Sequence, residues 1–262
     1  MTSMSVSEAR AALISAGITG PHRSHPRHKN LDKIHGLLTD DIEARFGIAG
    51  IERYSASEVL SFVAELTGCS PDIADIEAED AIDPDKTIEG ILGAARSLAD
   101  YAAQGASLLV ATGHPTGLLE HHIKVADAYR RAGGKLIRPL EDETFPLRRK
   151  RDAQIRYVSG VACLSDWGNL RHTHSSEAME VILDSGGEWP DVVLADHGFA
   201  GAAIQRGIPT IAVMDINDPA LAVAWADKRD VLVIPMDDNR LPRLYEPSWL
   251  LFEQVILGSG VS

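Results

Sequence analysis

The chain has 262 residues, with 25 Lys plus Arg and 38 Asp plus Glu, so its formal net charge is −13 with the ten histidines neutral. This acidic balance argues against nucleic acid as a partner, because binding phosphate backbones requires a strongly basic face. The apolar content of 45% is ordinary for a soluble globular protein and excludes global disorder.

The first hundred residues predict helices. Apolar residues recur at three- and four-residue spacings over residues 6–16, 31–46 and 56–67, and again over 85–104. Ser55, followed by Glu58, forms the pattern of a capping box at the start of the third helix. Residues 72–85, before and at the start of the last of these helices, carry seven carboxylates and no base, which indicates a solvated loop. We therefore predict a helical N-terminal subdomain over residues 1–104.

From residue 107 the pattern changes to short apolar runs that alternate with helical segments. This alternation is typical of βαβ units, so residues 105–262 predict an α/β domain with a mostly parallel, open, Rossmann-like sheet flanked by helices. Residues 155–174 can alternatively form a hairpin. The expected strands are 108–112, 135–138, 161–164, 192–195, 210–214 and 231–234.

The sequence also predicts a cytoplasmic protein without a membrane partner. No run approaches the roughly 20 apolar residues that cross a bilayer, and the N-terminus lacks the features of a secretory signal. Cys69 and Cys163 are too few for a disulfide framework and lack metal-type spacing, so we expect two reduced, buried thiols.

Histidines and aspartates gather where the predicted strands end. Six of the ten histidines fall between His114 and His197, mostly in these loops or at the helix starts that follow them. In an open parallel sheet, ligands bind outside the carboxyl ends of the strands, where helix N-termini and their free amides meet. We therefore expect the functional site at this edge of the sheet.

The first of these loops reads Gly113-His114-Pro115-Thr116-Gly117. Gly113 and Gly117 allow close backbone approach, so with Thr116 they are candidate phosphate-binding residues. The alternative is a tight turn in which Thr116 caps the helix. A histidine in such a turn has no packing reason to be there, so His114 is a candidate catalytic residue. His121 and His122, one turn onward, are expected to face solvent.

A second loop contains His172-Thr173-His174-Ser175. On an extended segment, His172 and His174 place both imidazoles on one face, which suits proton transfer, phosphate binding or metal ligation. Ser175 is a candidate phosphate-binding or helix-capping residue. A hydrogen-bonded strand end without catalytic function is the alternative.

Two strand–loop–helix units then supply candidate metal ligands. Asp196, Asp215 and Asn217 offer the oxygen atoms that magnesium or manganese prefers, and His197 would extend the choice to cobalt, nickel, iron or zinc. His197 is also a candidate catalytic residue. Gly198, at the start of its helix, is a candidate phosphate-binding residue. Asp218 precedes a proline and is expected to act as a helix cap.

Other polar segments are expected to be surface features. We interpret residues 237–240 as a polar turn after the last strand, with closure of the site's rim as the alternative. The basic segments 21–33 and 148–151 predict a solvated surface, or a cation placed over an anionic substrate. Trp249 and Phe252, near the carboxyl end, indicate core or the surface of a possible homodimer.

With these residues in view, the chain resembles a group of actinobacterial proteins of similar length labelled as phosphatases. The resemblance covers most of the chain and rests on four segments: GHPTGLLEHH, HTHSSEAM, ADHGFAGAA and DINDPALA. It implies phosphomonoester hydrolysis. The arrangement also looks like that of the metal-dependent damage-control phosphatases, by analogy of fold.

Common phosphatase nucleophiles are missing from the expected places. The chain lacks DxDx(T/V) after a first strand, HCx5R, and RHG near a first strand, so the nucleophile is expected to be water. The leading hypothesis is metal-assisted hydrolysis of a small phosphorylated metabolite. The alternatives are a phosphosugar lyase or isomerase that uses histidine acid–base chemistry, and a non-enzymatic nucleotide or metabolite sensor.

Overall fold

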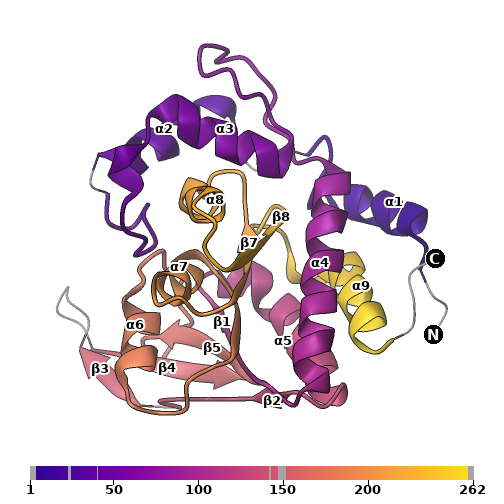
Figure 1. Ribbon diagram of the computed structural model, residues 1–262, viewed down its shortest axis with the longest axis vertical. Coiled ribbons are helices and arrows are strands. Elements are labelled where there is room, and N and C mark those ends of the chain that lie inside the picture. The colour runs from indigo at the N-terminus through magenta and orange to yellow at the C-terminus, as the bar shows by residue number, and fades with distance from the viewer. Residues whose placement is uncertain (1–3, 23–24, 40, 142, 147–151, 259–262) are drawn as a thin grey trace.

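The computed structural model describes residues 4–22, 25–39, 41–141, 143–146 and 152–258, and it shows an open α/β sheet (Figure 1). The sheet is mostly parallel and flanked by helices, which confirms the predicted α/β class. Within these ranges the order is β3-β4-β5-β1-β6-β7-β8, and β2 pairs only with β1. The strands are β1 (Ser107–Thr112), β2 (Lys135–Leu136), β3 (Thr144–Pro146), β4 (Asp152–Val158), β5 (Val161–Ser165), β6 (Val192–Asp196), β7 (Thr210–Met214) and β8 (Val231–Pro235).

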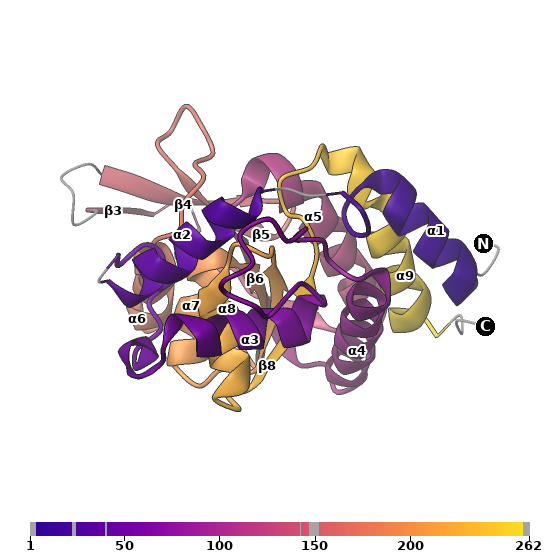
Figure 2. The same cartoon turned by 90° about the horizontal axis from the view of Figure 1, so that it is seen from above.

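Helices cover both faces of the sheet, as the view from above shows (Figure 2). Side chains alternate along β1: Leu109 and Ala111 pack in one hydrophobic core with α2, α3, α6, α7 and α8, whereas Leu108 and Val110 pack in the other with α1, α4, α5 and α9. The helices are α1 (Val6–Ala16), α2 (Arg27–Leu38), α3 (Ala56–Thr67), α4 (Pro84–Ala103), α5 (Pro115–Arg131), α6 (Glu177–Asp184), α7 (His197–Gln205), α8 (Pro219–Ala226) and α9 (Glu246–Ile256).

The topology brings five strand ends to one edge. Strands β5, β1, β6, β7 and β8 are mutually parallel, so their carboxyl ends lie together. The chain order changes direction at β1, which has β5 on one side and β6 on the other. Such a switch point opens a crevice at the strand ends, because the flanking connections go to opposite faces.

Helix α2 differs most from the sequence prediction. It begins at Arg27 and ends at Leu38, whereas the pattern predicted residues 31–46. Asp41 explains the early end, because its side chain accepts hydrogen bonds from the backbone of Glu43 and Ala44 and so stabilises turns in place of helix. Helices α1 and α3 have their predicted bounds.

Beyond β5 the sheet continues with two strands, β4 and β3, that the list of expected strands does not contain. Strands β3 and β4 are antiparallel, and β4 pairs in turn with β5, so the hairpin alternative for part of this region is correct. β2 ends at Leu136, because its pairing with β1 stops there. Few continuous apolar residues mark β3 and β4, since their outer positions face solvent.

The N-terminal helices pack directly on the α/β layers. α4 contacts β8 and lies beside α9, and both hydrophobic cores combine residues from the two sides of residue 104. The acidic stretch before α4 is not wholly solvated, because Asp80 is buried and forms an ion pair with Arg27 at 2.7 Å. The division into two domains stays a prediction.

Two further expectations concern the described part of the chain. Cys69 and Cys163 are free and buried, as predicted. Among the described helices, none combines the length and the apolar character that a membrane crossing requires.

Candidate functional site at the strand ends

Polar residues from five strand ends lie together in the structure. His114 follows β1, His172 follows β5, and Asp196 ends β6. Asp215 follows β7, and Asp238 follows β8. Side-chain contacts connect these segments: His114 to His172, and both His114 and His197 to Asp238.

Four imidazoles form the centre of this cluster. The ring centroids of His114 and His172 are 4.4 Å apart, and those of His172 and His174 are 4.9 Å apart. His174 stacks on His197 with centroids 4.6 Å apart. The ring of Phe46, from the loop after α2, packs edge-on against His174 and His197. His172 is exposed, so the cluster opens to solvent on its side.

His197 is held in a constrained backbone conformation. Its φ of 46° lies in the left-handed region, which is costly for a residue with a Cβ and is often found at functional sites. Its Nδ1 lies 2.9 Å from Asp196 Oδ1, so its Nε2 is directed to Asp238 Oδ2, 3.1 Å away. Burial lowers the pKa of His197, but the nearby carboxylates of Asp218 and Asp238 outweigh it and raise that pKa well above the usual value.

Asp196 is surrounded by hydrogen-bond donors. Its Oδ1 accepts a hydrogen bond from the backbone N–H of Gly113 at 2.7 Å, besides its contact with His197. Its Oδ2 lies 3.4 Å from His122 Nε2. Although burial raises the pKa of Asp196, the interactions with His122 and His197 hold it well below the usual range. A carboxylate that anchors an imidazole in this way fixes the orientation of the ring.

Three groups of side chains have the spacing of metal ligands. In each group one ligand atom per residue lies within 4.8 Å of the others. Among the described residues, His114 Nδ1 and Asp238 Oδ2 are buried and form no hydrogen bond of regular geometry. The atoms that face them, Asp238 Oδ1 at 3.4 Å and His197 Nε2 at 3.1 Å, are themselves possible ligand atoms. Buried polar atoms rarely lack a well-formed hydrogen bond, so this arrangement is compatible with a bound ion. The groups are His114, His172 and His197; His197, Asp218 and Asp238; and Asp215, Asp237 and Asp238.

The three residues predicted as metal ligands do not come together as one ligand group in the structure. Asp215 belongs to one of the three groups, whereas Asp196 belongs to none of them. The Asn217 side chain instead lies 3.2 Å from the His25 ring. Residues 237–240 turn after β8 as predicted, with Asp237 Oδ1 accepting from the N–H of Asn239, which is exposed. Asp237 and Asp238 are buried, however, and Asp238 faces the histidines, so the expected surface location is wrong for these two residues. A short polar stretch does not show which way its side chains point.

Asp218 occupies the position before α8 with proline at the start of the helix, as expected, but its side chain makes no capping hydrogen bond. Instead its Oδ2 accepts from the backbone N–H of Asp215 at 3.2 Å and lies 3.7 Å from His197 Nε2. Burial raises the pKa of Asp218 well above the ordinary carboxyl value. The proline at the next position indicated a helix cap, but it could not indicate the contact of Asp218 with His197.

His121 and His122 are buried, which contradicts the expected exposure. His121 is hydrogen-bonded to Ser248 Oγ at 2.9 Å, and its Nδ1 lies 3.1 Å from His122 Nδ1. His122 in turn reaches Asp196, so it lies behind the cluster. Helix α5 packs against α9, where His121 contacts Ser248. The spacing of residues within α5 does not predict this contact.

Part of the basic N-terminal segment lies over the site. His22 Nε2 is 2.7 Å from Asp237 Oδ2, and His25 Nδ1 is 3.6 Å from Asp215 Oδ2. Their side chains are 30% and 33% exposed, so these imidazoles lie between the buried carboxylates and solvent. The other basic segment, residues 148–151, lies outside the described residues.

The candidate phosphate-binding glycines lie against neighbouring backbone. A Cβ on Gly113 would come within 2.4 Å of Thr173 O, and one on Gly117 within 2.2 Å of Asp238 O. Gly198 is equally close to the backbone of Ser175. These glycines let the strand-end loops approach one another. Thr116 is exposed, and the phosphate-binding roles of these residues stay predictions.

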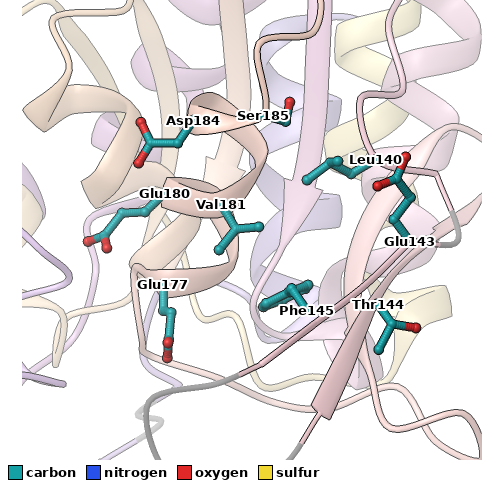
Figure 3. A pocket seen from close by; sticks show the side chains of 9 residues that line it. All are labelled: Leu140, Glu143, Thr144, Phe145, Glu177, Glu180, Val181, Asp184 and Ser185. Carbon is teal, nitrogen blue, oxygen red and sulfur yellow. The ribbon is translucent and has the colours of Figure 1, made fainter.

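A pocket of about 460 Å³ lies away from this cluster, between α6 and β3 (Figure 3). Four of its nine lining residues are carboxylates, among them Glu143 and Glu177, and its lining includes no histidine. Carboxylates repel a phosphoryl group, so this pocket is not the candidate site.

The fold and the strand-end cluster define an α/β protein with a buried histidine–aspartate centre. The chain belongs to the Phosphatase family, which matches residues 4–257. It is also 35% identical over 236 residues to Phosphatase SCO2771 from Streptomyces coelicolor, covering 87% of this chain and 88% of that protein. The expected resemblance to actinobacterial phosphatases is confirmed, and with it the assignment of the chain as a phosphatase. No solved structure matches the chain.

Proposed function

We propose that the protein is a metal-dependent phosphatase that hydrolyses small phosphorylated metabolites at the strand-end cluster. The ion would be held by His114, His172 and His197, with Asp238 as a further ligand. The observation that carries this proposal is the convergence of three imidazoles on a buried Asp238 carboxylate, which lies 3.4 Å from His114 Nδ1 and 3.1 Å from His197 Nε2.

The ligand set differs from the one predicted from sequence. Asp196 is better suited to orient His197 than to bind the ion, because its two oxygens already face Gly113 N–H and two imidazoles. Imidazole nitrogen favours manganese, cobalt, nickel, iron or zinc over magnesium at this position. We therefore expect Mn²⁺, Co²⁺ or Zn²⁺ to support activity more strongly than Mg²⁺.

The ion would polarise the phosphoryl group and lower the pKa of an attacking water. Two side chains beside His197 are available to take up the proton that this water loses. Burial, together with the neighbouring His197 and His172, lowers the pKa of His174 to about 3, so His174 is a weak base. Burial raises the pKa of Asp218, which brings it closer to the operating pH, and we assign proton transfer to Asp218.

The openness of the cluster supports a small substrate. His172 is exposed, whereas His114 and His197 are buried, so access is from the side of His172. A phosphoryl group on a small molecule can reach such a recessed centre more easily than one on a folded protein surface. The net charge of −13 further disfavours polyanionic substrates such as nucleic acids.

The test is phosphate release by chelator-treated protein from a panel of phosphorylated metabolites. Adding Mn²⁺, Co²⁺ or Zn²⁺ is expected to restore activity, and His172→Asn is expected to lower it more than about 100-fold. His28→Asn is the matched control, because His28 is exposed on α2. Full activity in the chelated protein would exclude the metal, and activity only on phosphoproteins would exclude the substrate class.

A further inference from the structure

We propose that the site binds two divalent cations, the second held by Asp215, Asp237 and Asp238. Asp238 would then be the bridge between the two ions. This inference rests on the proposed function, because it adds a second ion beside the one assigned to the imidazoles.

Two of the ligand groups share no residue. One consists of three imidazoles, His114, His172 and His197, and the other of three carboxylates. Each group is compact enough for its own ion, because its ligand atoms lie within 4.8 Å of one another. Their chemistry also differs: nitrogen ligands suit transition metals, whereas carboxylate oxygens suit Mg²⁺ or Mn²⁺.

Asp238 lies between the two groups. Its Oδ1 is 3.4 Å from His114 Nδ1, and its Oδ2 is 3.1 Å from His197 Nε2. The side chain is nearly fully buried, and among the described residues Oδ2 forms no hydrogen bond of regular geometry, its contact with His197 included. A carboxylate has lone pairs for two ions, so Asp238 can reach both groups at once.

The other two carboxylates are held in place by the backbone. Asp237 Oδ1 accepts from the N–H of Asn239 at 2.8 Å, and Asp215 Oδ1 accepts from the N–H of Ile216 at 2.7 Å. Both residues are buried, so their charges lie close together with little water to screen them. A cation among them would offset this repulsion.

The histidines of the N-terminal segment lie on the solvent side of these carboxylates. His22 contacts Asp237, and His25 contacts Asp215. Each imidazole therefore orients one carboxylate of the group from outside. This arrangement gives the basic segment a positioning role beside the second ion.

Two neighbouring ions would act together on a phosphate ester. In enzymes with two such ions, about 3.5–4 Å apart, the pair stabilises both the attacking and the leaving oxygen. No covalent intermediate is required, because water attacks phosphorus while the bond to the alcohol oxygen breaks. The leaving oxygen takes up a proton, and the products are the alcohol and inorganic phosphate.

The experiment is to measure Mn²⁺ bound per chain by equilibrium dialysis and metal analysis, with electron paramagnetic resonance of the loaded full-length protein. The wild type is expected to bind two Mn²⁺ whose spins are coupled through the shared carboxylate. One uncoupled Mn²⁺ per chain would overturn this inference and leave the proposed function intact. Absence of binding would overturn both.

Variants then locate the two ions. Asp237→Asn is expected to reduce binding from two Mn²⁺ to one and to abolish the spin coupling, and His172→Asn is expected to remove the other ion. Asp100→Asn, on the exposed face of α4, is the control and keeps two. Circular dichroism checks that each variant is folded. Two coupled ions in a folded Asp237→Asn protein would contradict the assignment of the ligands. If a variant does not fold, the number of Mn²⁺ ions bound by the wild type still tests the inference.

Discussion

Asp196 connects the imidazole cluster to the interior of the protein. It accepts a hydrogen bond from Gly113 N–H, faces His122, and holds His197 Nδ1 at 2.9 Å. Because Nδ1 of His197 is engaged, its Nε2 is the nitrogen that reaches Asp238. The orientation of a candidate metal ligand therefore depends on a residue that we place outside the ligand set.

Replacing this carboxylate should loosen the centre. Asp196→Asn has a single acceptor oxygen and would present an N–H to one of the imidazoles, so we expect Mn²⁺ affinity and phosphate release to fall about 10- to 100-fold. Asp191→Asn is the matched control: Asp191 accepts hydrogen bonds from Ser107, the first residue of β1, at the opposite ends of the strands. Calorimetric titration with Mn²⁺ measures the affinities, and equal losses in the two variants would contradict the positioning role.

His121 should make stability depend on pH. Burial, with His122 beside it, lowers the pKa of His121 well below 6.5, so the unfolded chain binds a proton that the folded chain excludes. This group's contribution is fully present above pH 6.5 and is lost as the pH falls below that value, by about 1.4 kcal/mol per pH unit. Glutamine does not titrate, so the substitution His121→Gln removes this pH-dependent loss of stability.

Urea unfolding at pH 7.5 and pH 5.0 measures the effect. The free energy of unfolding should fall more steeply with acidification in the wild type than in His121→Gln, because all other titrating groups are common to both. Equal pH dependence in the two proteins would show that His121 is not a buried neutral imidazole.

At the scale of elements, the strand-end loops are held together by glycines. Gly198, in the first turn of α7, lies where a Cβ would come within 2.3 Å of the Ser175 backbone. That backbone belongs to the loop with His172 and His174, so a change at Gly198 acts on the imidazoles. The contact joins α7 to the segment that precedes α6.

Gly198→Ala is therefore expected to destabilise the protein by about 1–3 kcal/mol, because rigid backbone must shift, and to reduce phosphate release as the histidine loop moves. Gly93→Ala is the contrasting variant: no atom lies within 4 Å of a Cβ there, and it is in the middle of α4. It should stabilise the protein by about 0.5–1 kcal/mol with unchanged activity. Thermal unfolding and the phosphate assay distinguish the two, and a stable, active Gly198→Ala protein would contradict this packing role.

Sequence patterns predicted the sheet better than they predicted the site. Apolar runs identified the parallel strands, and the strand-end rule led to His114, His172 and His197. Asp238 was missed because a polar run after a strand looks the same whether it faces water or the interior. The burial of His121 and His122 was missed because it depends on tertiary contacts, of His121 with α9 and of His122 with Asp196 at the end of β6.

At the scale of the whole molecule, residues far apart in the chain complete one site. His25 and Phe46 come from the N-terminal segments on either side of α2, yet they contact Asp215 and His197, which belong to the strand ends. The family match over residues 4–257 includes both regions. We therefore expect the N-terminal helices to be part of the functional unit, although local patterns within each region indicate separate subdomains.

The location of the bound ion is the most direct measure of the central claim. A crystal of the Mn²⁺-loaded protein, with diffraction recorded at the manganese absorption edge, shows each ion as an anomalous peak. The peaks are predicted among His114, His172, His197 and Asp238, at the carboxyl ends of β1, β5, β6 and β8. Ions found only elsewhere, such as in the acidic pocket between α6 and β3, would contradict the account.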